Sequence, residues 1–482
     1  MVNLAQIVDW SVPSNRDAVR FLSASGSVTT LGYEALKRQM AGVAAQLEPG
    51  STIGILAENR PEHFLITLGA WAAGAVAVPL NHKLPPDAIS HIVADADIAV
   101  TYTDSHLAAK LPSGHAARQI TPLKEQDGGI RATSADDVAV IMYTSGSTGM
   151  PKGVPISHGG YSWAMQQFRF LDEGIRGKTV LIAAPLFHMN AQFHILATLM
   201  CGGTAVLMER FSAEGFLAAM EAHEIARVTG VPTMFELAVR ALDAGYQADT
   251  HSVASIAMGS APVSQTLLDR LQAHFPSAAI SNGYGTTETG PAIFGVHPDG
   301  KPTPPLSIGY PMAGAQIKLV GPDAPQRGTL HVKSPMTLDA YRNLPDASAA
   351  KIKDGWYDTG DVMEADADGF YFFAERADDM FVCGGENVYP AQVEALLERH
   401  PGVEQACVVD IPDAVKGAIP VAFVVGSARS DALKAHTLEN GPAYAHPRFI
   451  VPLDALPLSG VNKVDRAALK RDARSRFEGA RS

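Results

Sequence analysis

The feature that most constrains the fold is a regular alternation of helical and extended patterns between Thr29 and about Leu171. Stretches with helical spacing of apolar residues take turns with short apolar runs of strand length. The helices are expected at 33–47, 61–73 and 85–94, and the strands at 51–56, 76–79 and 98–102. Alternation of this kind predicts a parallel sheet covered by helices.

The chain is too long for a single hydrophobic core. With 482 residues, it is expected to form two or three domains. Further strands are expected at 181–185, at 201–208 and at the start of each of the stretches 256–262 and 280–291. Two more, at 315–320 and 328–332, stand in a stretch rich in Pro, Gly and Asp. Beyond it, strands at 404–409, 420–425 and 449–453 alternate with helices at 391–399, at 431–439 and from 465 onward. The sequence predicts an α/β protein with a small β-rich subdomain and a separate α+β domain at its end.

Charge and cysteine spacing narrow the class of protein. The formal net charge is −12 and no long basic run occurs, which argues against a nucleic-acid partner. The three cysteines, Cys201, Cys383 and Cys407, are far apart and lack metal-site spacing, so neither a disulfide framework nor a zinc site is expected. A reduced, cytoplasmic setting fits this pattern.

Two stretches bear on membranes and export. The N-terminus lacks the basic segment, apolar core and cleavage site of a secretory signal. The apolar stretch 64–80 is just short of a membrane span and ends close to Pro79, so a buried helix followed by a buried strand is expected instead. We therefore predict a protein without an integral membrane segment.

A strand-like apolar run at 138–142 is followed, after Tyr143, by a loop rich in glycine and hydroxyl groups. The loop residues of interest are Thr144, Ser145, Gly146, Ser147, Thr148, Gly149, Lys152 and Gly153. Glycines let successive backbone N–H groups converge, and the hydroxyls and the lysine add donors, so the segment predicts a phosphate-binding loop. It is not a Walker loop, because Gly153 stands where the Mg²⁺-binding hydroxyl would be.

A second candidate site follows two more predicted strands, in the stretches IAMGSAP (256–262) and ISNGYGTTETGP (280–291). A nucleotide site needs small residues near the base, an aromatic face and a carboxylate for Mg²⁺. These groups are supplied by Gly259, Ser260, Ala261, Tyr284, Thr287 and Glu288. The GxG in the second stretch is not a dinucleotide fingerprint, because Glu288 occupies its sixth position.

The stretch YTSGSTGMPKGV (143–154) resembles the YTSGSTGxPKGV signature of the AMP-forming adenylating superfamily, which includes acyl-CoA synthetases, adenylation domains and luciferases. YGTTE (284–288) is similar to the superfamily motif YGxTE. Two further motifs, GWYDTGD (355–361) with the arginine after YFFAE (371–375) and LPLSGVNKVDRAAL (456–469), extend the resemblance from about Thr29 to Ala468. It implies a large N-terminal domain, residues 1–377, and a small mobile C-terminal domain, residues 378–482, with ATP, Mg²⁺ and coenzyme A as the partners of a small carboxylic acid.

The resemblance also implies roles for individual residues. Tyr284 would pack on adenine, Thr287 would contact phosphate, and Glu288 would hold the metal. The remaining assignments are Asp361 and Arg376 on the ribose hydroxyls, Lys463 as the catalytic lysine, His188 in PLFHMN with Gly283 and Gly309 at the acid pocket, Asp378 as the hinge, and Gly384 and Gly385 at the CoA passage.

Three positions depart from the family pattern. Glu375 replaces a glycine before Arg376, which leaves the local backbone geometry open. Asn462 replaces the glycine before Lys463, although asparagine tolerates the left-handed conformation that such a turn requires. Lys416 and Gly417 stand where many relatives have Trp-Gly-Glu, so contacts during thioester formation are expected to differ.

The sequence analysis thus favours an ATP-dependent carboxylate–CoA ligase that makes an acyl-adenylate, releases pyrophosphate and then forms a thioester. The expected substrate is an aromatic acid of the benzoate or hydroxycinnamate type. A medium-chain fatty acid, a carrier protein as the acceptor, and a non-catalytic acid sensor remain as alternatives. Oligomeric state, a homodimer included, is left open.

Overall fold

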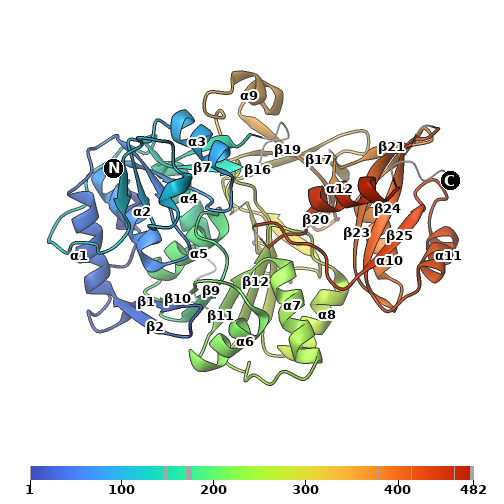
Figure 1. Cartoon of the computed structure of the whole chain (residues 1–482), viewed down its shortest axis with the longest axis horizontal. Helices are drawn as coiled ribbons and strands as arrows, with labels where there is room; N and C mark the ends of the chain where they lie inside the picture. Colours follow the sequence, from blue (N-terminus) through green and yellow to red (C-terminus); the bar gives the residue numbers. More distant parts are fainter. Residues whose placement is uncertain are drawn as a thin grey trace.

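The structure is a computed structural model that describes residues 2–144, 150–169, 176–291, 293–377, 379–413, 415–460 and 462–477. Figure 1 shows a large N-terminal domain, coloured blue to yellow, and a smaller C-terminal domain in orange and red that carries α10, α11 and α12. The fold class expected from the sequence is confirmed by this arrangement.

The first sheet is built from the alternating segments that follow the N-terminal hairpin. Its strands, in spatial order, are β6 (Ala117–Gln119), β5 (Val100–Thr103), β3 (Thr52–Leu56), β4 (Val76–Pro79), β7 (Val138–Thr144) and β8 (Lys152–Ser157). All are parallel except β8, which runs antiparallel to β7. The connecting helices are α1 (Tyr33–Ala44), α2 (Pro61–Ala73), α3 (Pro86–Asp95) and the 3₁₀ turn η2 (Ala108–Lys110).

The second sheet lies beside the first. Its strands, in spatial order, are β13 (Ala279–Gly283), β12 (Ser255–Gly259), β11 (Arg227–Gly230), β9 (Thr179–Ile182), β10 (Thr204–Met208), β1 (Asp17–Leu22) and β2 (Val28–Gly32). They are parallel except for β2. Its helices are α4 (His158–Arg169), α5 (Met189–Met200), α6 (Ala213–Ala222), α7 (Pro232–Asp243) and α8 (Gln265–His274), and the chain starts with η1 (Leu4–Gln6).

The main hydrophobic core joins these two sheets. Trp71 of α2 contacts Tyr161 of α4 edge to face at 5.9 Å, and Tyr161 is stacked with Phe193 of α5 at 6.3 Å between ring centres. All three side chains are buried. Because helices from both sheets share one core, the two α/β layers form a single body.

The third sheet is antiparallel and forms the β-rich subdomain. Its strands are β14 (Phe294–Gly295), β15 (Ser307–Pro311), β20 (Tyr371–Arg376), β19 (Trp356–Ala365), β17 (Arg327–Lys333) and β16 (Gln316–Val320), with β18 (Ile352–Lys353) paired to β19 after α9 (Pro345–Lys351). The sequence analysis placed this subdomain around the strands expected at 315–320 and 328–332, whereas β19 and β20 extend the sheet to Arg376.

The C-terminal domain has a sheet and a core of its own. Its strands are β22 (Glu386–Val388), β21 (Phe381–Cys383), β24 (Gly417–Gly426) and β23 (Val403–Asp413), with β25 (Phe449–Leu453) paired to β24. Its helices are α10 (Pro390–Glu398), α11 (Ser430–Asn440) and α12 (Arg466–Phe477). A separate cluster of buried side chains, among them Phe423 and Leu397, fills the space between helices and sheet.

Most expected elements lie where the pattern predicted them, and the differences have local causes. The strand expected at 181–185 ends at Ile182, and the one expected at 201–208 begins at Thr204, because Gly202 has a left-handed φ of 63° and turns the chain. The apolar stretch 64–80 is the buried helix α2 followed by β4, as expected. Among the described residues, no helix is long and apolar enough to cross a membrane.

Candidate active site

The first part of the site lies at the carboxyl edge of the second sheet. β9, β12 and β13 run in the same direction, so the residues that follow them reach the same edge of the sheet. His188, Ser260 and Tyr284 follow these three strands. Ligands of α/β proteins bind at such edges, so the two stretches singled out in the sequence open on one region, as expected.

Glycines at this edge allow the backbones of neighbouring strands to approach closely. Gly259 and Gly283 are paired across β12 and β13, and a Cβ on Gly259 would lie 2.9 Å from the carbonyl oxygen of Gly283. Ser260 then turns the chain with a φ of 67°. The site therefore starts from a tight, narrow strand end that leaves room above it.

The pair expected on the ribose hydroxyls is held by the β-rich subdomain. Asp361 of β19 and Arg376 of β20 are cross-strand partners, and Arg376 Nη1 donates to Asp361 Oδ1 at 2.9 Å. Tyr284 donates its hydroxyl to the other carboxylate oxygen of Asp361 at 2.5 Å. Burial and the charge of Asp361 raise the pKa of Tyr284 well above its ordinary value, so the phenol stays protonated. Three of the predicted nucleotide-binding residues are thus in direct contact.

Glu288 is oriented by two tyrosines that the sequence analysis missed. Tyr341 donates its hydroxyl to Glu288 Oε1 at 2.9 Å, and the hydroxyls of Tyr341 and Tyr357 are also 2.9 Å apart. Lys152 lies with its Nζ 5.3 Å from the centre of the Tyr341 ring. The glycine-rich segment and the YGTTE motif therefore meet at Tyr341, although no pattern in the sequence marks this residue.

Glu288 fits the requirements of a magnesium ligand, as the resemblance implies. Mg²⁺ usually takes one or two carboxylates and completes its shell with water and substrate phosphate oxygens. Burial, followed by the negative charge of Glu288, raises the pKa of Tyr341, so the phenol stays protonated and donates to the carboxylate. The described residues contain no cluster of three or more His, Cys, Asp or Glu side chains, so a dedicated all-protein metal cage is absent from that part of the chain.

Lys463 projects from a hairpin of the C-terminal domain toward the ribose pair. Ser459 N donates to Lys463 O at 2.7 Å, and Asn462 has a left-handed φ of 59°, so asparagine does make the turn that relatives make with glycine. Burial lowers the pKa of Lys463, while the charge of Asp361 raises it and that of Arg376 lowers it. Among the described residues no hydrogen bond or ion pair to Lys463 Nζ is present.

His188 stands at the N-terminus of α5 and faces the same region. Burial, together with the positive charges of Lys463 and Lys83, lowers its pKa to about 3, so the imidazole is neutral at physiological pH. Its ring centre lies 4.6 Å from that of Phe187. Its Nε2 is buried and has no hydrogen-bond partner among the described residues, so it is available to a ligand.

The segment that carries His188 is fixed by a buried asparagine. Asn59 Nδ2 donates to the carbonyl oxygens of Ala184 and Met208 at 3.0 and 3.1 Å, and Asn59 Oδ1 accepts from Leu186 N at 2.8 Å. One side chain therefore satisfies three backbone groups, two in the irregular stretch between β9 and α5 and one at the end of β10. An isolated asparagine carries no sequence signal for this role.

Other candidates have different surroundings or lie outside the described residues. Gly309 has a φ of 107°, and a Cβ there would lie 2.5 Å from Gly295 O, so packing alone demands a glycine; its place in the acid pocket stays a prediction. Gly384 and Gly385, with φ values of 63° and 90°, form the turn between β21 and β22. Outside the described residues lie Ser145, Gly146, Ser147, Thr148, Gly149 and Asp378. Thr144 ends β7. Within the described part of the chain, Ala261 and Thr287 have no side-chain interaction that defines a role.

The family departures also acquire a structural setting. Glu375 is buried on β20, where its carboxylate accepts hydrogen bonds from Arg327 Nη2 at 2.5 Å and from Gln392 Nε2 of α10 at 3.1 Å. β20 pairs with β19 through Glu375, and the register shifts by one residue beside it, at Ala374, so the strand passes this position with a local irregularity. Lys416 O accepts a hydrogen bond from Gly384 N at 2.8 Å and supports the turn at Gly384 and Gly385.

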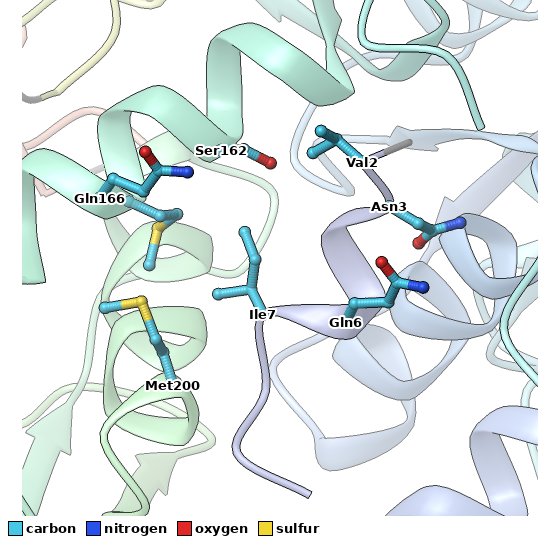
Figure 2. A pocket seen from close by; sticks show the side chains of 8 residues that line it. Val2, Asn3, Gln6, Ile7, Ser162, Gln166 and Met200 are labelled. Carbon is cyan, nitrogen blue, oxygen red and sulfur yellow. The ribbon is translucent and has the colours of Figure 1, made fainter. Parts of the chain in front are cut away.

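A separate cavity lies away from these residues, between the N-terminal segment and the helices α4 and α5 (Figure 2). It has a volume of about 270 Å³ and is lined by Val2, Asn3, Gln6, Ile7, Ser162, Met165, Gln166 and Met200. None of the candidate site residues lines it. The cavity therefore has no part in the site built from Asp361, Glu288 and Lys463.

Comparison with known proteins agrees with this geometry. The AMP-binding enzyme family matches residues 8–342, and the AMP-binding enzyme C-terminal domain matches residues 392–463. A feruloyl-CoA synthase of Amycolatopsis sp. is 33% identical over 97% of this chain and 98% of its own length. A 2-succinylbenzoate–CoA ligase of Bacillus velezensis is 31% identical over 91% of each chain.

Among solved structures, the o-succinylbenzoate CoA synthetase of Bacillus subtilis in complex with its acyl-adenylate superposes with a TM-score of 0.80. The identity is 27%, and the match covers 98% of both chains. Sequence and fold agree over nearly the whole length. The chain therefore belongs to the AMP-binding enzyme family.

Proposed function

We propose that the protein is an ATP-dependent ligase that joins an aromatic carboxylic acid to coenzyme A through an acyl-adenylate. The observation that carries the proposal is the environment of Lys463, a largely buried cation beside the Asp361–Arg376 pair. The carboxylate that acts on it, Asp361, is already paired with Arg376. A buried cation that lacks its own counter-ion is unfavourable, so such a site suits an anionic ligand.

In the first step a carboxylate oxygen of the acid attacks the α-phosphorus of ATP. The bond to the bridging β-phosphate oxygen breaks, pyrophosphate leaves, and the acyl-adenylate remains. Lys463 and Lys152 neutralise negative charge on the phosphates, and the loop 144–149, most of which lies outside the described residues, is assigned to hydrogen-bond to them. The transfer needs positioning and charge stabilisation, and no residue has to remove a proton.

The nucleotide is held by residues from two sheets. Asp361 and Arg376 bind the ribose hydroxyls, Tyr284 packs against adenine beside Gly259, Ser260 and Ala261, and Thr287 contacts phosphate. Mg²⁺, when bound at Glu288, supplies positive charge next to the phosphates. The fixed orientation of the Glu288 carboxylate by Tyr341 supports this assignment.

In the second step the CoA thiol attacks the acyl carbonyl, loses its proton, and AMP leaves. A thiol with a pKa of about 8.5 needs no dedicated base against so activated an acyl group. A rotation at Asp378 would withdraw Lys463 and bring the turn at Gly384 and Gly385 to the cleft. The division into residues 1–377 and 378–482, and a cytoplasmic location where ATP and CoA are present, belong to the same proposal.

An aromatic substrate is supported by relatives and by the aromatic side chains that surround His188. Feruloyl-CoA synthase and 2-succinylbenzoate–CoA ligase are both named for acids that contain a benzene ring. Near the site, three aromatic rings are in contact. The ring centre of Phe187 lies 5.3 Å from that of His82 and 4.6 Å from that of His188. Such a lining favours a planar ring through stacking and edge contacts. His188, with Gly283 and Gly309, is assigned to this pocket.

The proposal is tested by product analysis. The protein is incubated with ATP, Mg²⁺ and a panel of benzoates, hydroxycinnamates and medium-chain fatty acids, with and without CoA, and products are identified by mass spectrometry. AMP together with an aryl-CoA is expected. Adenylates without thioesters would indicate a carrier protein as the acceptor, and the absence of AMP with every acid would refute ligase activity.

The role of Lys463 has its own test. Lys463→Ala is expected to lower acid-dependent ATP–pyrophosphate exchange by about 100- to 1,000-fold, because a charge-stabilising contact is lost in the transition state. Lys434→Ala, which removes a lysine of α11 in the same domain, is the matched control and should retain wild-type exchange. Retained exchange in Lys463→Ala would refute the assignment.

A further inference from the structure

We propose that Lys83 is a positioning residue for adenylation, because it holds the hairpin that carries Lys463 against the N-terminal domain. Lys83 Nζ donates a hydrogen bond to the carbonyl oxygen of Gly460 at 2.6 Å, across the two domains. The inference rests on the proposed function, since it assigns Lys83 to the half-reaction that uses Lys463.

The hairpin transmits its position to Lys463 directly. Ser459 N donates to Lys463 O at 2.7 Å, and Asp465 N donates to Pro457 O at 2.7 Å. Leu458 and Val464 form an antiparallel bridge between these two bonds. With its backbone fixed in this way, Lys463 moves with the hairpin as a unit.

The bond from Lys83 is the hairpin's attachment to the larger domain. Within the described parts of segment 457–465, it is the one hydrogen bond that reaches an N-terminal residue. The side chain of Lys83 also packs against the hairpin, since a Cβ on Gly460 would lie 2.8 Å from Lys83 Cδ. Both the charge and the stem of Lys83 therefore contribute to the contact.

Lys83 itself stands on a well-fixed loop at the carboxyl end of β4. Lys83 N donates to Asn81 Oδ1 at 2.9 Å, and Leu84 N donates to Asn81 O at 3.0 Å. Lys110 Nζ donates to Leu84 O at 3.3 Å and also to His82 O. An anchor on a rigid loop can hold a partner, which a lysine on a mobile loop could not.

The hairpin needs such an anchor because, among the described residues, Lys463 Nζ makes no hydrogen bond or ion pair that would hold it in place. Within the described parts of the chain, two other polar contacts join the domains, Arg240 with Glu404 at 3.1 Å and Gln392 with Glu375 at 3.1 Å; they involve β23 and α10 and do not reach the hairpin. Loss of the Lys83 contact should therefore misplace Lys463 without dissolving the rest of the interface. Adenylation should suffer, whereas thioester formation should not.

The kinetic experiment compares the two half-reactions in Lys83→Met, Lys83→Arg and the wild type. Acid-dependent ATP–pyrophosphate exchange reports adenylation, and single-turnover conversion of a synthetic acyl-adenylate with CoA reports thioester formation. Lys83→Met should lower the exchange rate about tenfold and change thioester formation by less than about twofold. Lys83→Arg, which keeps a cationic donor, should recover most of the exchange.

Lys333→Met is the matched control. Lys333 Nζ also donates to a backbone carbonyl oxygen, that of Asp354 at 3.0 Å, but both residues belong to the β-rich subdomain. This variant should keep both half-reactions at wild-type rates. An equal loss of both half-reactions in Lys83→Met, or no loss at all, would overturn the proposal.

A second measurement decides the proposal without any substrate. Spin labels are placed on cysteines introduced at Asp127 and Val415. The side chain of Asp127 is 93% exposed and Val415 is 91% exposed, while the native cysteines are buried. Lys83→Met should add a longer interdomain distance to the distribution, and an unchanged distribution would overturn the proposal. If the wild type shows no ATP–pyrophosphate exchange with any of the acids tested, the proposed function fails. The spin-label distances would still decide the role of Lys83.

Discussion

Arg327 offers a direct test of how the protein tolerates a carboxylate in place of the family glycine at position 375. The Glu375 residue is only 3% exposed, and Arg327 Nη2 donates to its carboxylate at 2.5 Å. In Arg327→Met the carboxylate would stay buried with Gln392 as its remaining donor among the described residues. Breaking a buried ion pair costs about 3–5 kcal/mol, and the 31% exposure of the Arg327 side chain reduces this to about 2–3 kcal/mol.

The cost should depend on pH in a defined direction. Burial already raises the pKa of Glu375, and removal of the arginine charge would raise it further. In Arg327→Met the folded state therefore holds a proton on Glu375 more readily than the unfolded state does. The stability of the variant falls as the pH rises through this pKa, so the loss relative to the wild type should be smaller at pH 5 than at pH 8.

Urea unfolding, followed by tryptophan fluorescence at both pH values, measures these differences. Arg20→Met is the control, because Arg20 pairs at 2.8 Å with Asp17, whose side chain is 30% exposed against 4% for that of Glu375. This change should cost less than about 1 kcal/mol. In a Glu375→Gln background, Arg327→Met should also cost less than about 1 kcal/mol. An equal cost in the presence and absence of the Glu375 charge would refute the reasoning.

Three further predictions concern single side chains. Asn59→Ala should lower the free energy of unfolding by about 2–4 kcal/mol, since it leaves three buried backbone groups without a partner, and urea denaturation would show whether it does. Tyr341→Phe should reduce pyrophosphate exchange about tenfold and raise the Mg²⁺ concentration for half-maximal rate, whereas an unchanged Mg²⁺ dependence would argue against the Glu288 orientation. Burial and the charges of Glu394 and Glu236 raise the pKa of Glu398 from 4.5 to about 7, so its contribution to stability is present below pH 4.5 and is lost as the pH rises through 7. Glu398→Gln should remove about 2–3 kcal/mol of this decline in stability. An identical slope of stability against pH in the variant and the wild type would contradict the prediction.

Local patterns predicted the fold well where local physics decides it. The helix Pro61–Ala73 has proline in its first turn and ends at Gly74 with a φ of 74°, and its boundaries follow from those residues. Asn462 could be read as a left-handed turn residue for the same reason. The β-rich subdomain was only partly predicted, because β19 and β20 complete its sheet through pairings distant in sequence.

The site was predictable as a set of residues and not as a set of contacts. The motifs named Asp361, Arg376 and Tyr284, but the bonds among them depend on the register of β19 with β20 and on the position of β13. Tyr341, which orients Glu288 from 53 residues away, and Lys83, 377 residues from Gly460, have no signal in the sequence. Such partners are set by tertiary packing, which periodicity and composition do not encode.

The burial of Lys463 beside an already paired carboxylate links ligand binding in the cleft to the orientation of the C-terminal domain. In the docked arrangement, the protein bears the cost of a desolvated cation. An anion that binds in the cleft relieves that cost. By thermodynamic reciprocity, the binding free energy that the anion gains from Lys463 stabilises this arrangement of the C-terminal domain by the same amount. An empty protein should thus sample other orientations of that domain more readily than one filled by a polyanion.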